Sequence, residues 1–160
     1  MSFTTVRPGK LSIIASDFNA RPISFVQDGE RWGYEPAVAR AVCEYLGLDP
    51  VWFNLPIAEF YTALSAGDYD VVWFTQAITQ ERRAWADFTR PYGRFDEAVL
   101  VREDSPIHSV YDLAGRRLGG LADGTSIALA EDFPEPQIVP FAGSDQVVPE
   151  MLQALRRGEI

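Results

Sequence analysis

Hydrophobic and polar positions along the chain form short apolar runs that alternate with segments of helical spacing. The runs "KLSIIAS" (10–16), "PVWFNL" (50–55) and "YDVVWF" (69–74) are rich in β-branched and aromatic residues, so each predicts a buried strand. Between them, segments 34–47 and 57–67 repeat apolar residues at helical spacing and end in glycine, which favours a helix end. This alternation predicts a parallel α/β sheet.

The helix predicted over 34–47 has terminal signals at both ends. Pro36 suits its first turn and Gly47 its C-terminal cap. The single cysteine, Cys43, lies in the apolar pattern and excludes an intrachain disulfide; we interpret it as a buried structural thiol, with a reactive thiol as the alternative. The spacing predicts an apolar face made of Ala37, Val38, Ala41, Val42, Tyr45 and Leu46.

A second set of elements follows Asp96. We expect strands over 97–103, 116–122 and 136–142, and helices over 109–115, 124–133 and 144–158. Ser144 is the expected N-cap of the last helix. The predicted apolar face of that helix consists of Val148, Met151, Leu152 and Leu155. The sequence then stops at "GEI", where α/β logic calls for another strand, so we expect an incomplete second domain.

The segment "TQAITQERRAWADFTRPY" (75–92) follows the strand predicted to end at Phe74. The carboxyl end of a parallel strand points at the crevice where α/β sheets bind ligands. We therefore expect a crevice loop over 75–78 and a helix from Gln80, capped by Thr79. Arg82 falls on its first turn, where it is either a ligand contact or a solvated helix residue.

Composition narrows the function classes. With 160 residues and 47% hydrophobic residues, the chain can form one domain or two small lobes. A net charge of −9 argues against partners that are polyanions, namely nucleic acid and anionic lipid. No segment reaches about 18 apolar residues, and the start lacks the apolar core of a leader. We expect either a cytosolic protein or one whose leader has been replaced by a starting methionine.

Four ordered motifs carry a family resemblance. They are "ASDFNARPI" (15–23), "GYEPAVA" (33–39), "GDYDVVWFTQAITQERRAWADFTRPY" (67–92) and "DLAGRRLGGLADGTS" (112–126). Together they resemble the polar amino-acid-binding family of periplasmic solute-binding proteins of ABC importers, bacterial extracellular solute-binding protein family 3. Several motifs in the right order are far more specific than one.

The resemblance implies a type II periplasmic-binding-protein-like clamp of two α/β lobes, 1–93 and 94–160. The second lobe is incomplete, and a strand at Ala98–Val101 crosses into it. The implied protein is the extracytoplasmic substrate-binding component of an ABC importer, which closes on an amino acid by hinge motion. It binds without catalysis or cofactor, and its partner is an ABC permease. The alternatives are a ligand-sensing module of a receptor or regulator and, less favoured, a dehydratase-like enzyme.

The resemblance also implies site residues. Arg82 takes the ligand α-carboxylate in a bidentate pair, and Thr75 offers backbone and hydroxyl groups beside it. Gly124 and Thr125 begin a helix in the second lobe and present donors to the same carboxylate. A plain turn and N-cap is the alternative interpretation of Gly124 and Thr125.

In the first loop, Asp17 matches an aspartate that lies near the ligand, although a simple turn-former would look the same. The chain departs from the family at Ala20, where a tyrosine is usual, and at Ile57, where an aromatic ring stacks on the ligand. Ala77 occupies a ligand-contact position that usually carries a hydroxyl. Phe18 is the first candidate for a replacement aromatic wall; Trp73 and Phe74 are further candidates, although aromatic residues in strands usually belong to the core.

Catalytic signals are weak. His108 is the single histidine, and a lone loop histidine is usually a surface residue. The sequence has no Cys/His metal spacing, nucleophile elbow or phosphate loop.

Overall fold

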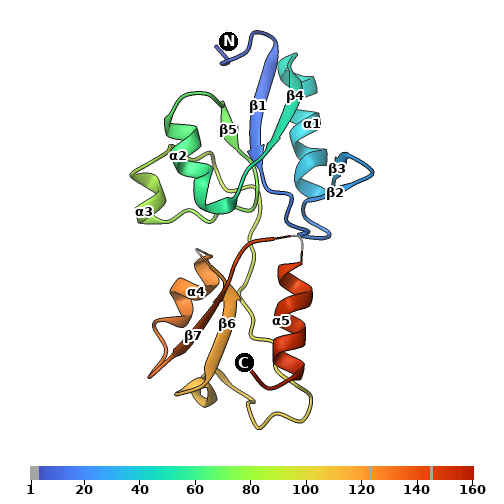
Figure 1. The fold of residues 1–160 in the computed structure, drawn as a ribbon. Coiled ribbons are helices and arrows are strands. Elements are labelled where there is room, and N and C mark those ends of the chain that lie inside the picture. Colours follow the sequence, from blue (N-terminus) through green and yellow to red (C-terminus); the bar gives the residue numbers. More distant parts are fainter. Residues whose placement is uncertain (1–3, 123, 145) are drawn as a thin grey trace. The chain divides into compact units, whose positions relative to one another are not determined.

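The computed structural model describes residues 4–122, 124–144 and 146–160. It divides into two compact units, Met1–Thr89 and Arg90–Ile160 (Figure 1). We call them the first and second units.

A three-stranded parallel sheet forms the centre of the first unit. Its strands are β1 (Lys10–Ala15), β4 (Asp49–Asn54) and β5 (Val71–Val72), in the order β4-β1-β5. Lys10 pairs with Asp49 and Ala15 with Asn54, and β5 pairs with the middle of β1. The predicted parallel α/β arrangement is therefore confirmed. β5 is shorter than the predicted strand because its ladder spans only two residue pairs.

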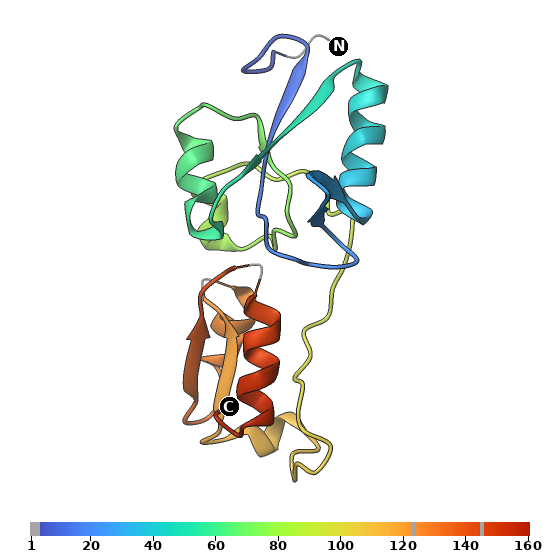
Figure 2. The same ribbon diagram turned by 45° about the vertical axis from the view of Figure 1, so that its right-hand side comes forward.

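Two longer helices lie on opposite sides of this sheet (Figures 1 and 2). They are α1 (Tyr34–Leu46) and α2 (Phe60–Ser65), the latter preceded by the 3₁₀ helix η1 (Ile57–Glu59). Gly47 ends α1 in the left-handed region, at φ 69°, and its amide donates to the carbonyls of Cys43 and Glu44. This is the C-terminal cap that the sequence predicts.

The buried face of α1 differs from the predicted one. Tyr45 is 89% exposed, whereas Glu35, Ala39 and Cys43 are fully buried. These three residues are four apart, so they form one stripe along the helix. Helical spacing is compatible with burial of either this stripe or the neighbouring stripe of apolar residues that the sequence predicts. The tertiary contacts of α1 bury the stripe that contains the Glu35 carboxylate. Burial of Cys43 is confirmed, and burial raises the pKa of its thiol.

The core of the first unit is an aromatic cluster on β1. Phe60 and Phe74 lie edge to face with ring centroids 6.1 Å apart, and both are buried against Ile14 and Ala15. Burying one such ring stabilises the folded state by roughly 1.5–3 kcal/mol. The expected core role of Phe74 is confirmed.

A hairpin that the sequence analysis missed connects β1 to α1. Its strands are β2 (Phe25–Gln27) and β3 (Glu30–Trp32), joined by a turn in which Asp28 and Gly29 have φ of 53° and 79°. Asp-Gly is the typical pair for such a turn and was the available signal. The hairpin brings Arg31 inside, where only 4% of it is exposed.

The second unit contains a two-stranded parallel sheet, β6 (Arg117–Leu121) and β7 (Gln137–Phe141). Helices α4 (Thr125–Ala130) and α5 (Val147–Arg156) lie on opposite sides of it (Figures 1 and 2). A 3₁₀ helix, η2 (Val110–Leu113), stands where the sequence predicts a short helix.

Three predictions for the second unit are wrong. Segment 97–103, including Ala98–Val101, forms no strand, because no described strand pairs with it; propensity without a ladder partner does not make a strand. Ser144 is not the N-cap of α5: Gln146 holds that position, and the Ser144 hydroxyl accepts from its amide at 3.2 Å. Val147 and Ala154 are buried in α5, whereas Val148 and Leu152 of the predicted face are exposed.

Across the described ranges, no helix combines the length and the apolar character that crossing a membrane requires.

Candidate functional site

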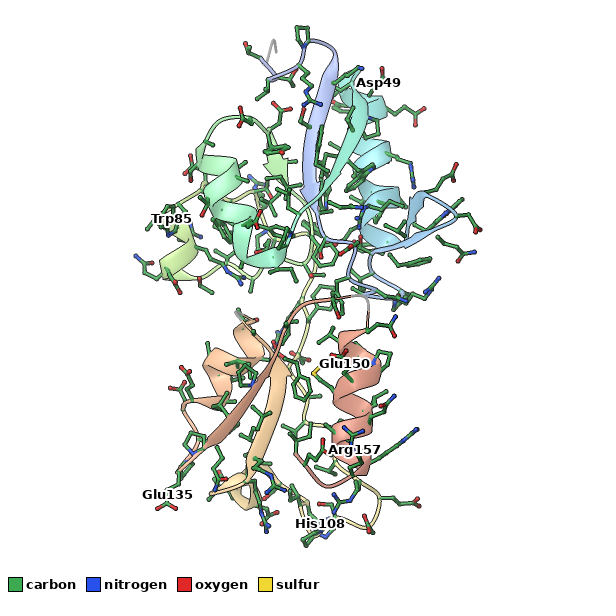
Figure 3. All side chains as sticks on the ribbon, viewed as in Figure 1. Asp49, Trp85, His108, Glu135, Glu150 and Arg157 are labelled. Carbon is green, nitrogen blue, oxygen red and sulfur yellow. The ribbon has the colours of Figure 1, made fainter. Side chains whose placement is uncertain are left out.

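The candidate site lies where the parallel strands of the first unit end. β1, β4 and β5 finish at Ala15, Asn54 and Val72, and we call this end of the sheet the carboxyl edge. Asp49, at the beginning of β4, marks the opposite edge (Figure 3). Because the strands are parallel, the loops that follow them leave from the same edge.

Thr75 is held by a buried carboxylate. Its amide donates to Oε1 of Glu35 at 2.8 Å, and Glu35 is fully buried in the first turn of α1. The backbone of Thr75 has φ 42°, a conformation that β-branched residues rarely adopt. A contact from α1 therefore fixes the loop after β5.

Arg82 lies on the short helix α3 (Gln80–Arg83) that follows this loop. The Thr79 side chain caps α3 by accepting from the Arg82 amide, as predicted. The Arg82 guanidinium donates to the Ala77 carbonyl at 3.2 Å and lies 5.7 Å from the centroid of the Tyr61 ring. In the described ranges, no carboxylate forms an ion pair with this half-buried guanidinium. Its remaining N–H groups suit a carboxylate.

Tyr61 links Arg82 to the loop after β5. Its hydroxyl donates to Oε1 of Gln76 at 2.9 Å, and Nε2 of Gln76 donates to the Phe74 carbonyl at 2.6 Å. Burial raises the pKa of Tyr61, and the positive charge of Arg82 opposes that shift. Tyr61 therefore stays a neutral hydrogen-bond donor near neutral pH.

Asp17 and Phe18 follow β1, and their different exposure to solvent indicates different roles. Asp17 is exposed, whereas Phe18 is half-buried with its ring 6.1 Å from that of Phe74, edge to face. The Phe18 ring extends the aromatic core to the carboxyl edge. The Phe18 amide donates to the Ser16 hydroxyl at 3.2 Å, which shapes the turn.

Arg31 lies beneath these loops. It donates to the Ser24 hydroxyl at 2.9 Å, to the Ser16 carbonyl at 2.7 Å and to Oδ1 of Asn54. Burial lowers the pKa of its guanidinium, and the charges of Asp17 and Glu35 oppose the shift. An arginine stays charged under such shifts, so the carboxyl edge is built on a buried cation.

The second unit holds the remaining predicted site residues. Gly124 precedes α4, and a Cβ there would lie 2.9 Å from the Leu121 carbonyl oxygen, so the turn requires glycine. The Thr125 hydroxyl donates to Oε1 of Glu97 at 3.4 Å. Gly124 provides no side-chain cap for α4.

The structure thus places five predicted site residues at one edge of the first unit, four of them in loops and Arg82 on α3, and two in the second unit. The five are Asp17, Phe18, Thr75, Ala77 and Arg82; the two are Gly124 and Thr125. Sequence reasoning missed Arg31 and Glu35 as contributors to the edge. Glu35 lies inside the "GYEPAVA" motif, so its place was visible although its contact with Thr75 was not.

Comparison with known proteins assigns the family. The family model described as bacterial extracellular solute-binding proteins, family 3, matches residues 13–159. The chain belongs to this family. The match confirms the resemblance drawn from the four ordered motifs.

Two curated relatives have low identity to this chain. A probable histidine-binding protein of Campylobacter jejuni is 26% identical over 102 residues, covering 63% of this chain and 40% of the relative. A probable histidine-binding protein of Neisseria gonorrhoeae is 26% identical over 149 residues, covering 90% of this chain and 56% of the relative. The chain therefore spans about half the length of these curated relatives.

A solved structure supports the two-lobed α/β fold class. An ancestral amino-acid-binding protein, described as a precursor of cyclohexadienyl dehydratase, superposes with a TM-score of 0.83 at 25% identity. The superposition covers 94% of this chain and 67% of that one.

Proposed function

We propose that the complete protein binds an amino acid, or a similar small carboxylate-bearing solute, as the substrate-binding component of an ABC importer. Arg82 carries the proposal, because its guanidinium is half-buried at the carboxyl edge and has a backbone carbonyl and an aromatic ring as neighbours. A guanidinium held in this way is oriented for a bidentate carboxylate. The relatives named for histidine and amino-acid binding support this ligand class.

In this proposal Thr75 and Ala77 line the ligand carboxylate beside Arg82, and Asp17 faces the ligand's positive group. Phe18 supports the loop from the core more than it stacks on the ligand, because its ring packs on Phe74. Gly124 and Thr125 remain proposed contacts from the second unit. An extracytoplasmic location and an ABC permease as partner belong to the same proposal.

The test is calorimetric binding of an amino-acid panel to the full-length protein and to Arg82→Ala. Losing a buried bidentate carboxylate contact should cost about 2–5 kcal/mol of binding free energy. Arg83→Ala is the matched control, because Arg83 is the exposed neighbour on α3, placed 6.0 Å from the Phe88 ring centroid. Equal affinity of Arg82→Ala and the parent protein would reject the role of Arg82.

A dehydratase-like enzyme is the second candidate, favoured by the ancestral relative's description as a precursor of cyclohexadienyl dehydratase. His108 offers it little, because it lies at the opposite end of the second unit from the start of α4 (Figure 3). Incubating the protein with each bound panel member and measuring ligand recovery separates the two functions. Complete recovery supports binding alone, and consumption supports the enzyme.

A further inference from the structure

We infer that Arg31 and Glu35 are positioning residues that hold the loops of the carboxyl edge together and set the charge preference of the ligand site. The inference rests on the proposed function, because it concerns the same site. Neither side chain is placed to touch a ligand: Arg31 is 4% exposed and Glu35 is fully buried. Both act through the residues that they hold.

Arg31 joins three parts of the chain that are far apart in sequence. One guanidinium nitrogen donates both to the Ser16 carbonyl, directly after β1, and to the side chain of Asn54, at the end of β4. The other terminal nitrogen donates to Ser24, just before the hairpin. A planar fork with several fixed donors can make these contacts together, whereas a lysine ammonium on a flexible stem cannot reproduce their directions.

Glu35 fixes the third strand end. Its Oε1 accepts from the Thr75 amide at 2.8 Å and so holds Thr75 at φ 42°. Thr75 begins the loop that leads to Ala77 and Arg82. Together, Arg31 and Glu35 therefore restrain the loops after β1, β4 and β5.

The same two residues place opposite charges beneath the site. The positive charge of Arg31 acts on Asp17, which is exposed in the loop after β1, and on Glu35. Without Arg31, the negative charges of Asp17 and Glu35 would act on the ligand without the offset from its guanidinium and would favour a cationic ligand. Without the negative charge of Glu35, the positive charge of Arg31 would be offset by Asp17 alone, and the site would disfavour a cationic ligand. Charges act over several ångströms in a protein interior, so neither residue needs to touch the ligand.

The first test compares L-arginine with L-citrulline, its neutral isostere, as calorimetric probes within an amino-acid panel on the full-length protein. Arg31→Met should raise the affinity ratio of arginine to citrulline about tenfold, and Glu35→Gln should lower it about tenfold. Opposite signs are the deciding observation, because a general loss of structure would not reverse the preference. Unchanged ratios in both variants would overturn the inference.

Matched controls are available in the first unit. Glu44→Gln neutralises an exposed carboxylate on the same helix, α1. Arg31 lies over the Trp52 ring, 5.4 Å from its centroid. Arg7→Met removes a guanidinium in a similar position, 4.5 Å from the centroid of the Phe53 ring, but Arg7 precedes β1 at the opposite edge. Both controls should leave the affinity ratio unchanged.

The second test needs no ligand. Hydrogen exchange at the Thr75 amide should accelerate at least about tenfold in Glu35→Ala, which removes the acceptor. It should change little in Glu35→Gln, whose side-chain carbonyl still accepts. Unchanged protection in Glu35→Ala would overturn the positioning role. If the parent protein binds no panel member, the proposed function fails, while the exchange result still decides whether Glu35 positions Thr75.

Discussion

Gly33 precedes α1 in a backbone conformation that glycine alone tolerates, with φ 118° and ψ −176°. A Cβ on this residue would lie 2.4 Å from the carbonyl oxygen of Ile23 and 2.9 Å from that of Pro22. Both obstacles are backbone atoms, which cannot rotate away. The same carbonyls accept from the amides of Glu35 and Tyr34, at 3.0 and 3.1 Å. Gly33→Ala must therefore disturb the contacts that begin α1.

The expected cost has two parts. A residue with a Cβ in this conformation costs about 1–3 kcal/mol. Displacing the Pro22 and Ile23 carbonyls weakens two hydrogen bonds, each worth about 0.5–1.5 kcal/mol. We therefore expect Gly33→Ala to lower the free energy of unfolding of the first unit by about 2–6 kcal/mol. Because Glu35 lies two residues further on, its hold on Thr75 should loosen too.

Native-state hydrogen exchange of the α1 amides measures the loss of stability in the first unit alone. This assay is suitable because a chain of two units need not unfold in one step. Gly29→Ala is the matched control. Gly29 has φ 79°, but no atom lies within 4 Å of the position that a Cβ would take there, so its cost should stay near 1–2 kcal/mol. Equal losses of protection in both variants would refute the argument, because backbone crowding at Gly33 would then contribute nothing.

Two further predictions concern carboxylates. The Asp70 carboxylate accepts hydrogen bonds from the Val6 and Ser12 amides, both at 2.7 Å. Asp70→Asn should therefore lower the free energy of unfolding of the first unit by about 1–3 kcal/mol, measured by hydrogen exchange of the β1 amides during urea unfolding. The control Asp68→Asn, which changes an exposed carboxylate, should not. Donation from the His108 amide, then from the Ser109 hydroxyl and amide, lowers the pKa of Asp112. Its stabilisation is complete above the ordinary aspartate pKa of about 3.9 and is lost as pH falls through the lower folded value. Protection of η2 should fall with it in acid, and a fall of the same size in Asp112→Asn would contradict this assignment.

The sequence identified most elements of the first unit because their signals are local. β1 and β4 are apolar runs whose residues fit one strand, and Gly47 can close α1 whatever surrounds it. The cap of α3 by Thr79 is equally local, since its donor is the Arg82 amide three residues later. Ordered motifs then located the candidate site, because loops that follow parallel strands share one edge.

Elements that need a distant partner were harder to predict. Segment 97–103 has the composition of a strand, but strand formation depends on a ladder partner, and no described strand supplies one. The hairpin was overlooked because strands of three residues leave too short a pattern, although the Asp28–Gly29 turn marked it. For α1, helical periodicity predicted the helix but not its rotation about its own axis. The buried stripe therefore lies next to the predicted apolar face instead of on it.

By itself, then, the sequence determined the alternation of strands and helices around the sheet of the first unit, the family, and the segments after β1 and β5 that carry Asp17, Thr75 and Arg82. Only the tertiary structure placed a buried arginine and a buried glutamate beneath those loops. Charged residues are expected at the surface, and they become buried only where several distant groups satisfy them together. For Arg31 those groups include Ser16, Ser24 and Asn54, and for Glu35 they include the Thr75 amide. Such convergence is a property of the folded chain, since no local segment contains all of its members.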